Sequence, residues 1–218
     1  MDSPGFVGAE HAFHDAEFAA GWAERFTPTA PRLRLFDAMV EQLRDSPAAA
    51  GRIVELGAGP GFLAERVLAS LPAVRYVAVD FSEAFLSLAR RRLARFADRV
   101  TWVRADLLSR EWPEAVGGPV EACVSTWALH DLGSPEATGK VYADCAGLLA
   151  GCGVLLNGDF VKPEGTAYAF EPGRFEVSRH LEFLRTAGFV RCECLEMFEL
   201  EIRRPTAAQN YALLSAHR

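Results

Sequence analysis

Three glycines at alternate positions, Gly57, Gly59 and Gly61, follow an apolar run and precede an expected helix. Residues 51–56 have the composition of a parallel strand that is covered on both faces, and Pro60 is compatible with a first helical turn. Glycines at such a turn let the backbone pass close to a ligand, with free backbone N–H groups facing it. A tight turn without a ligand would use the same residues.

An acidic residue follows at a spacing that indicates nucleoside binding. A second apolar run, residues 74–79, leads into Asp80, nineteen positions after Gly61. A carboxylate at the tip of the second strand, roughly 20 residues after the glycines, is placed to accept hydrogen bonds from a ribose diol. The spacing therefore predicts a nucleoside ligand at the carboxyl edge of an α/β sheet.

Two features argue against a nicotinamide dinucleotide as that ligand. Phe62 stands where the dinucleotide fingerprint has a third small residue, so the glycines run G-x-G-x-G and not G-x-G-x-x-G. The two lysines, Lys140 and Lys162, have no tyrosine four residues before them, so the chain lacks a Tyr-x-x-x-Lys pair for hydride chemistry.

The stretch from Glu55 to Gly61 resembles the first motif of class I S-adenosylmethionine-dependent methyltransferases, and the resemblance covers about residues 51–211. It implies S-adenosylmethionine as the cofactor. It also implies an α/β fold with a doubly wound, Rossmann-like sheet of seven strands whose last strand is antiparallel. The residues expected to bind the cofactor are Glu55, Gly57, Ala58, Gly59, Gly61, Asp80, Phe81, Ser82, Asp106, Leu107, Thr126 and Trp127.

Asp106 and Leu107 come directly after the third expected strand, residues 99–104. In methyltransferases that resemble this chain, the acidic residue at this point hydrogen-bonds the adenine amine and its neighbour packs on the ring. Asp106 would alternatively cap the short helical stretch that follows it.

His130 and Asp131 are the candidate catalytic residues. The fourth expected strand, residues 120–126, delivers them to the ligand edge of the sheet. Imidazole titrates near neutral pH, so we hypothesise that His130 is a general base or orients the acceptor, with Asp131 as its partner. Alternatively, both residues cap the turn before Leu132. Residues 128–132 resemble the fourth motif of small-molecule methyltransferases and lack the Asn-Pro-Pro-Tyr or Asp-Pro-Pro-Tyr tip of families that methylate adenine or glutamine.

No metal site is expected. A magnesium-assisted, catechol-type mechanism would need clustered carboxylates after the fourth strand. Asp131, Asn157 and Asp159 would supply part of such a set, but the usual lysine partner is absent. His11 and His14 are spaced for one helical turn, and we do not expect them to be ligands. The five cysteines include no C-x-x-C pair and fit a reducing cytoplasm.

Composition limits the classes of partner. The chain has 218 residues, half of them hydrophobic, which is enough for one domain with a full core. Its formal net charge of −6 does not favour binding to the negatively charged backbone of a nucleic acid. The basic cluster at residues 90–95 fits the solvated face of a helix. Residues 1–5 do not begin a signal peptide, and no apolar run has the length of a membrane span. We expect a cytoplasmic protein without nucleic-acid or membrane partners.

Two helices are expected before the glycine motif, at residues 10–26 and from residue 31 or 32 to residue 44. Phe18, Trp22 and Phe26 form an aromatic stripe on the first. We expect an N-terminal helical cap at residues 1–50 and a cofactor-binding core at residues 51–218, together forming one compact domain. The stripe would pack against the sheet edge or close as a lid over cofactor and substrate, as such helices often do in the resembled family.

The second half of the chain predicts two more helices and three more strands. The helices begin near Ser134 and Glu176 and are closed by Gly151 and Gly188; the strands are residues 153–160, 189–197 and 210–217, the last two antiparallel in the resembled fold. Residues 180–189 are similar to a recurrent ending of that fold. The aromatic loop at residues 161–175 would select the substrate or cover the core.

The resemblance implies methyl transfer from S-adenosylmethionine to a small-molecule acceptor, which we expect to occur at oxygen or nitrogen. Two alternatives remain: a catalytically silent, methyltransferase-like binding or regulatory protein, and another nucleoside-binding Rossmann-like protein.

Overall fold

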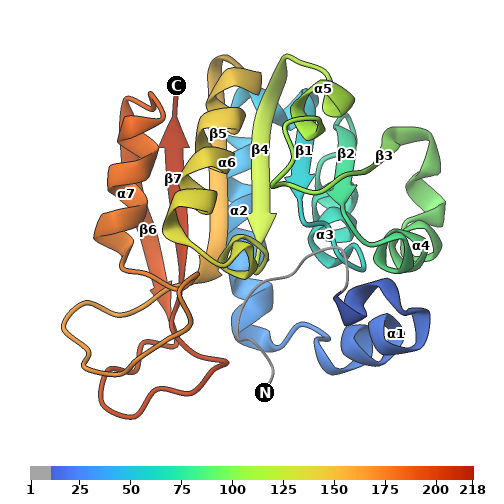
Figure 1. Ribbon diagram of the computed structural model, residues 1–218. Helices are drawn as coiled ribbons and strands as arrows, with labels where there is room; N and C mark the ends of the chain where they lie inside the picture. The colour runs from blue at the N-terminus through green and yellow to red at the C-terminus, as the bar shows by residue number, and fades with distance from the viewer. Residues whose placement is uncertain (1–10) are drawn as a thin grey trace.

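A computed structural model describes residues 11–218, which form a seven-stranded sheet between two layers of helices (Figure 1). The strand order is β3-β2-β1-β4-β5-β7-β6, and β7 runs antiparallel to both of its neighbours while the other strands are parallel. This confirms the predicted fold class. The strands are β1 (Arg52–Leu56), β2 (Arg75–Asp80), β3 (Val100–Arg104), β4 (Val120–Thr126), β5 (Leu149–Phe160), β6 (Arg191–Phe198) and β7 (Tyr211–His217).

Helices cover both faces of the sheet, with α2 behind it and α6 in front of it in Figure 1. The α-helices are α1 (Ala16–Arg25), α2 (Ala30–Arg44), α3 (Phe62–Ser70), α4 (Glu83–Arg92), α5 (Trp112–Val116), α6 (Pro135–Leu148) and α7 (Val177–Thr186). The 3-10 turns are η1 (Ala12–His14), η2 (Pro47–Ala50), η3 (Ala94–Arg99) and η4 (Leu129–Leu132). None of the helices within residues 11–218 is long and apolar enough to cross a bilayer.

Alternate side chains of each central strand pack into two separate hydrophobic cores, one on each face of the sheet. In β1, Ile53 joins the core beneath α2 and α3, whereas Val54 joins the core beneath α5, α6 and α7. Side chains of a strand point alternately to its two faces, so a strand covered on both sides reads as a continuous apolar run. This is the pattern that identified residues 51–56 as a central strand.

The boundaries of two predicted elements are wrong. The helix expected at residues 10–26 begins in the described chain as η1 and then α1, because Asp15 is extended and its side chain caps α1 by accepting the Phe18 N–H at 2.7 Å; Glu10 lies outside the described residues. The helix expected to reach Gly151 ends at Leu148, because Leu149 is extended and already pairs with Val120.

Helix α2 packs tightly on the middle of the sheet. Leu35 is fully buried there, and a β-carbon added to Gly158 of β5 would lie 2.6 Å from its Cδ2 atom. The glycine therefore lets the helix approach the strand closely. Leu33, on the same helix, is 43% exposed.

We expect Leu35→Ala to lower the free energy of unfolding by about 2–5 kcal/mol, because it removes buried methyl groups and leaves a cavity against Gly158. Leu33→Ala is the matched control and should change it by less than about 0.5 kcal/mol. Urea denaturation of both variants measures the difference, and equal effects would contradict the packing described for α2.

Candidate functional site

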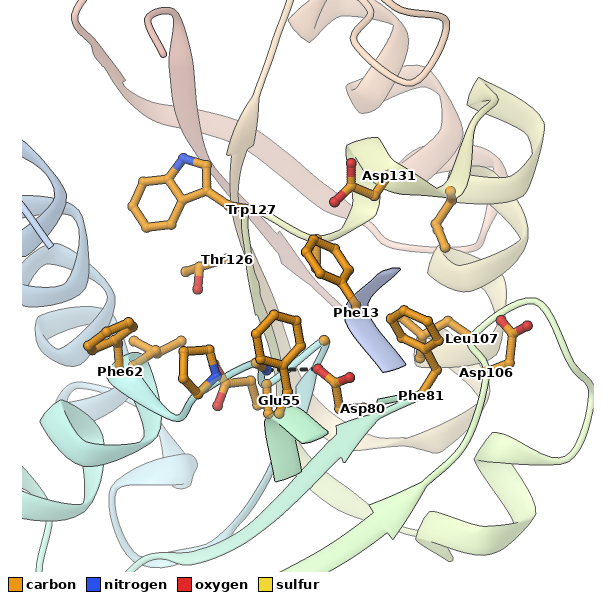
Figure 2. Close-up of a pocket in the computed structure, with 18 of the residues that line it drawn as sticks. Phe13, Glu55, Phe62, Asp80, Phe81, Asp106, Leu107, Thr126, Trp127 and Asp131 are labelled. Atoms are coloured by element: carbon orange, nitrogen blue, oxygen red, sulfur yellow. Dashed lines mark hydrogen bonds between the residues drawn. The ribbon is translucent and has the colours of Figure 1, made fainter. Parts of the chain in front are cut away.

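A cavity lies where the carboxyl ends of β1, β2 and β4 meet, on the side of the sheet edge that η1 and α1 cover (Figure 2). The strand order reverses between β1 and β4, which is where open α/β sheets bind ligands. Ten of the predicted cofactor-binding residues line this cavity: Glu55, Gly57, Ala58, Gly59, Asp80, Phe81, Asp106, Leu107, Thr126 and Trp127. Asp131 lines it as well, whereas Gly61, Ser82 and His130 do not.

The glycine turn gives a ligand room, but its amides are largely occupied. Gly57 and Gly59 have φ angles of +69° and +51°, and a β-carbon on Gly57 would collide with Ala128 whereas one on Gly59 would meet nothing within 4 Å. The Ala58 N–H donates to Val79 O at 2.9 Å, and the Gly61 N–H donates to Ala58 O at 3.0 Å. The expectation of free N–H groups is therefore wrong at these two positions, where one donor bonds to β2 and the other bonds within the turn.

Asp80 ties the glycine turn to the start of α4. Its carboxylate accepts the Gly59 N–H at 2.8 Å (Figure 2). It also accepts the Ser82 N–H at 2.8 Å. Burial raises the pKa of Asp80 to about 6, although these N–H groups favour the charged form. The Ser82 hydroxyl caps α4 at Phe85 N–H and donates to Phe13 O, so Ser82 positions η1 and does not face the cavity.

Glu55 is a second buried carboxyl group beside Asp80. It is 1% exposed and accepts the Tyr76 hydroxyl at 2.9 Å. Burial, with a smaller contribution from the charge of Asp80, raises the pKa of Glu55 to about 8, although the hydrogen bond from Tyr76 opposes this shift. In the ligand-free protein this group is therefore mostly neutral at pH 7.

The cavity is lined by acidic residues and by no basic ones. Glu55, Asp80, Asp106 and Asp131 contribute to its wall, and within residues 11–218 no lysine, arginine or histidine does. A diphosphate would be repelled by these carboxylates, whereas a cationic ligand would be attracted to them. The lining thus supports the sequence argument against a dinucleotide.

Asp106 has the local, turn-stabilising role that was one of the two weighed for it from sequence. One carboxylate oxygen accepts the Leu108 N–H at 2.8 Å, so the residue does stabilise the turn that follows β3. The residue also lines the cavity next to Leu107, which is 7% exposed. Contact with an adenine ring stays a prediction for both.

Aromatic side chains close the cavity on the side of the N-terminal elements. Phe13 of η1 lies with its ring centroid 4.9 Å from Phe85 and 5.6 Å from Trp22, and both Phe13 and Trp22 line the cavity. The three aromatic residues predicted to form one stripe do not share one environment. Trp22 stacks on Phe26, with ring centroids 4.4 Å apart, whereas Phe18 is 40% exposed. Phe13 was missed because it belongs to a separate turn, outside the helical spacing of the stripe.

A second cavity of about 310 Å³ adjoins the first. The two share Phe13, Trp22, Trp127 and Asp131 in their walls, so a ligand in one would lie next to a ligand in the other. The residues that line only the second cavity are Phe26, Arg32, His130, Phe160, Ala207 and Ala208.

His130 faces this second cavity and is held by Asp159, not mainly by Asp131. Its Nδ1 atom lies 2.7 Å from Asp159 Oδ1, and its backbone N–H donates to Asp159 Oδ2 at 2.9 Å. Its Nε2 atom lies 3.3 Å from Asp131 Oδ1. The sequence considered Asp159 only as a metal ligand; its position at the end of β5, beside the end of β4, was the available signal.

The surrounding charges set the protonation of His130. Burial lowers the pKa of this imidazole, but the adjacent Asp159 carboxylate and then Asp131 outweigh burial and leave it raised. The pKa of Asp159 is lowered because the imidazolium outweighs the effect of burial. Within residues 11–218, no group of three or more His, Cys, Asp or Glu side chains is arranged to hold a metal ion.

Residues 53–153 match a family model described as "Methyltransferase domain". An uncharacterized methyltransferase of Mycobacterium tuberculosis (strain ATCC 25618 / H37Rv) is 32% identical over 130 residues, which are 59% of this chain and 57% of that relative. The chain thus matches less than two thirds of the relative's length.

Two solved structures show the same fold. A structure of PigF with SAH superposes with a TM-score of 0.67 over 94% of this chain and 60% of that one, at 16% identity. The mitomycin 7-O-methyltransferase MmcR gives 0.67 over 95% of this chain and 59% of that one, at 17% identity. Residues 53–153 are thus similar in sequence to methyltransferase domains, and the two superpositions show that the chain has the same fold as these solved structures.

The raised pKa of Glu55 predicts how the stability of the ligand-free protein depends on pH. A carboxyl group whose pKa is higher in the folded state than in the unfolded state stabilises the fold when it is protonated. For Glu55 this contribution is fully present below pH 4.5, the pKa of the unfolded state, and is lost as the pH rises through about 8, the pKa of the folded state. We expect the free energy of unfolding of Glu55→Gln, relative to wild type, to increase steadily between pH 5 and pH 8.

The exposed Glu41→Gln substitution is the matched control, and it should leave the pH dependence of wild type unchanged. Urea denaturation at four pH values measures all three proteins. A constant difference between wild type and Glu55→Gln across this range would contradict the assignment of a raised pKa to Glu55.

Proposed function

We propose that this chain transfers a methyl group from S-adenosylmethionine to an oxygen or nitrogen atom of a small-molecule acceptor. The observation that carries the proposal is an acidic cavity that shares a wall with a second, aromatic cavity containing His130. The first suits a cationic nucleoside and the second an aromatic ring system. We further propose a cytoplasmic protein without nucleic-acid or membrane partners, in line with its net charge of −6.

The residues of the first cavity fit the cofactor. In this proposal Asp80 accepts the ribose hydroxyls, Asp106 and Leu107 contact the adenine, and Glu55 faces the cationic amino-acid end. The space in front of Gly59 admits the ligand, since no atom lies within 4 Å of the position of an added β-carbon. When bound, S-adenosylmethionine supplies an electrophilic methyl group on a sulfonium centre.

The chain's own residues account for the other half of the reaction. The acceptor atom, held in the second cavity, forms a bond to the methyl carbon as the carbon–sulfur bond breaks, and the acceptor's proton passes to Nε2 of neutral His130. Asp159 holds the opposite ring nitrogen and stabilises the imidazolium that results. Phe13 and Trp22 cover the junction of the two cavities and exclude water from it.

Transfer from methyl-labelled S-adenosylmethionine to a panel of small phenols and amines tests the proposal. We expect labelled product with at least one acceptor, and His130→Gln should reduce turnover of a hydroxyl acceptor about 10²- to 10⁴-fold. Binding of S-adenosylhomocysteine without transfer to any acceptor would instead support the catalytically silent alternative. Absence of binding would contradict the cofactor assignment as well.

The contact between His130 and Asp159 predicts the titration of one histidine. In NMR spectra of protein with labelled histidine, we expect the His130 signal to titrate with a pKa above 6.5 and to shift to lower pKa in Asp159→Asn, because that substitution removes the charge that favours imidazolium. His130→Gln assigns the signal.

Asp98→Asn, at an exposed position, is the control and should leave this titration unchanged. If Asp159→Asn leaves the His130 pKa where it is in wild type, the proposed base is not held as described.

A further inference from the structure

Arg32 lies on the wall of the second cavity, in the first turn of α2. Its guanidinium carbon is 3.8 Å from the ring centroid of Phe26 and 5.4 Å from that of Trp127. Within residues 11–218 this half-buried side chain makes cation–π contacts but no hydrogen bond or ion pair. Burial lowers the pKa of Arg32, and the nearby Tyr211 and then exposed Glu199 offset this only in part.

Two buried donors without partners lie near this guanidinium. Trp127 is 6% exposed and its Nε1 atom has no hydrogen-bond partner. The hydroxyl of fully buried Tyr211 has no partner of good geometry either, although the carboxylate of exposed Glu199 lies near it. The two rings lie 5.4 Å apart. Figure 2 shows the indole nitrogen turned away from Glu55 and Asp80, so it does not serve the first cavity. A buried polar group without a partner is rare and calls for a ligand or water.

The backbone of Trp127 adopts a strained conformation at this position. Its φ angle of +47° is in the left-handed region, which is an outlier for a bulky aromatic residue. Such strained conformations cluster at ligand-binding sites, where the surrounding structure enforces them. Here the Trp127 N–H donates to Gly158 O at 2.9 Å, and the ring packs among Phe26, Phe36 and Tyr211.

The hydrogen-bonding properties of Arg32, Trp127 and Tyr211 indicate which ligand group they would bind. Guanidinium and indole nitrogens donate hydrogen bonds and accept none, and a tyrosine hydroxyl donates as well. A planar carboxylate matches the fork of an arginine and would leave an oxygen for a further donor. A neutral carbonyl would leave the half-buried positive charge uncompensated.

The rest of the cavity suits an aromatic ring. Its volume of about 310 Å³ is roughly twice that of the ~150 Å³ engineered cavity that binds benzene. Half of its ten lining residues are aromatic side chains: Phe13, Trp22, Phe26, Trp127 and Phe160. The space therefore admits one or two fused rings with a substituent.

The rings of Trp127 and Phe160 lie between Arg32 and His130, the proposed base. Their ring centroids are 6.4 Å apart, and the His130 ring lies 5.1 Å from Phe160, edge to face. We propose that the methyl acceptor is an aromatic acid whose carboxylate binds Arg32, Trp127 Nε1 and the Tyr211 hydroxyl while its hydroxyl or amine faces His130. This assignment of substrate class rests on the proposed function.

Matched acid and amide probes test the assignment. Hydroxybenzoate, hydroxycinnamate and 6-hydroxy-2-naphthoate, each with its primary amide, are titrated into the full chain while tryptophan fluorescence is recorded, with and without saturating S-adenosylhomocysteine. For at least one scaffold we expect the acid to bind 10-fold or more tightly than its amide. Arg32→Gln should bring the two within 2-fold, and Arg32→Lys should retain part of the preference.

Arg34→Gln is the matched control, since Arg34 is on the same helix but exposed, and it should keep the full preference for acids. Circular dichroism and S-adenosylhomocysteine affinity show that each variant is folded. Equal binding of every acid and its amide to wild type, or a preference that survives in Arg32→Gln, would overturn the inference. Failure of S-adenosylhomocysteine to bind wild type would overturn the proposed function instead, because the acid and amide titrations do not depend on it.

Discussion

Two carboxyl groups buried side by side, Glu55 at the end of β1 and Asp80 at the end of β2, set the chemistry of this protein. Burial raises their pKa values to about 8 and about 6, and a hydroxyl from Tyr76 and two backbone N–H groups only partly stabilise their charged forms. No cation of the described chain lines their cavity. A cationic ligand would allow both groups to ionise, so the site favours such a ligand over an anionic one.

The sheet places the other functional groups around this pair. Parallel pairing of β4 with β1 and with β5 brings the Thr126–Trp127 tip and the Asp159 carboxylate to the same edge as Glu55. Asp159 then fixes His130 in the neighbouring cavity. The aromatic elements at the N-terminal side of the described chain cover the junction. The two cavities thus lie next to each other along the carboxyl edge of the sheet.

Local patterns in the sequence were sufficient for the parts of the fold and site that depend on local rules. Apolar runs identified the strands, and the glycines with Asp80 located the cavity. The occupied amides of the turn, the contact of Asp159 with His130, and Phe13 and Arg32 in the cavity walls were not predicted, because each depends on which strands are neighbours or on how α2 and η1 pack. Such tertiary contacts leave no periodic signal in one sequence.

Calorimetric titration of the protein with S-adenosylmethionine at pH 7, in two buffers of different ionisation enthalpy, tests whether the buried pair Glu55 and Asp80 ionises when a cationic ligand binds. The account predicts one binding site and net release of protons, because the cationic ligand ionises a Glu55 carboxyl that is mostly neutral beforehand. The release should be lost in Glu55→Gln. Absence of binding heat, or a heat that is the same in both buffers, would contradict the account.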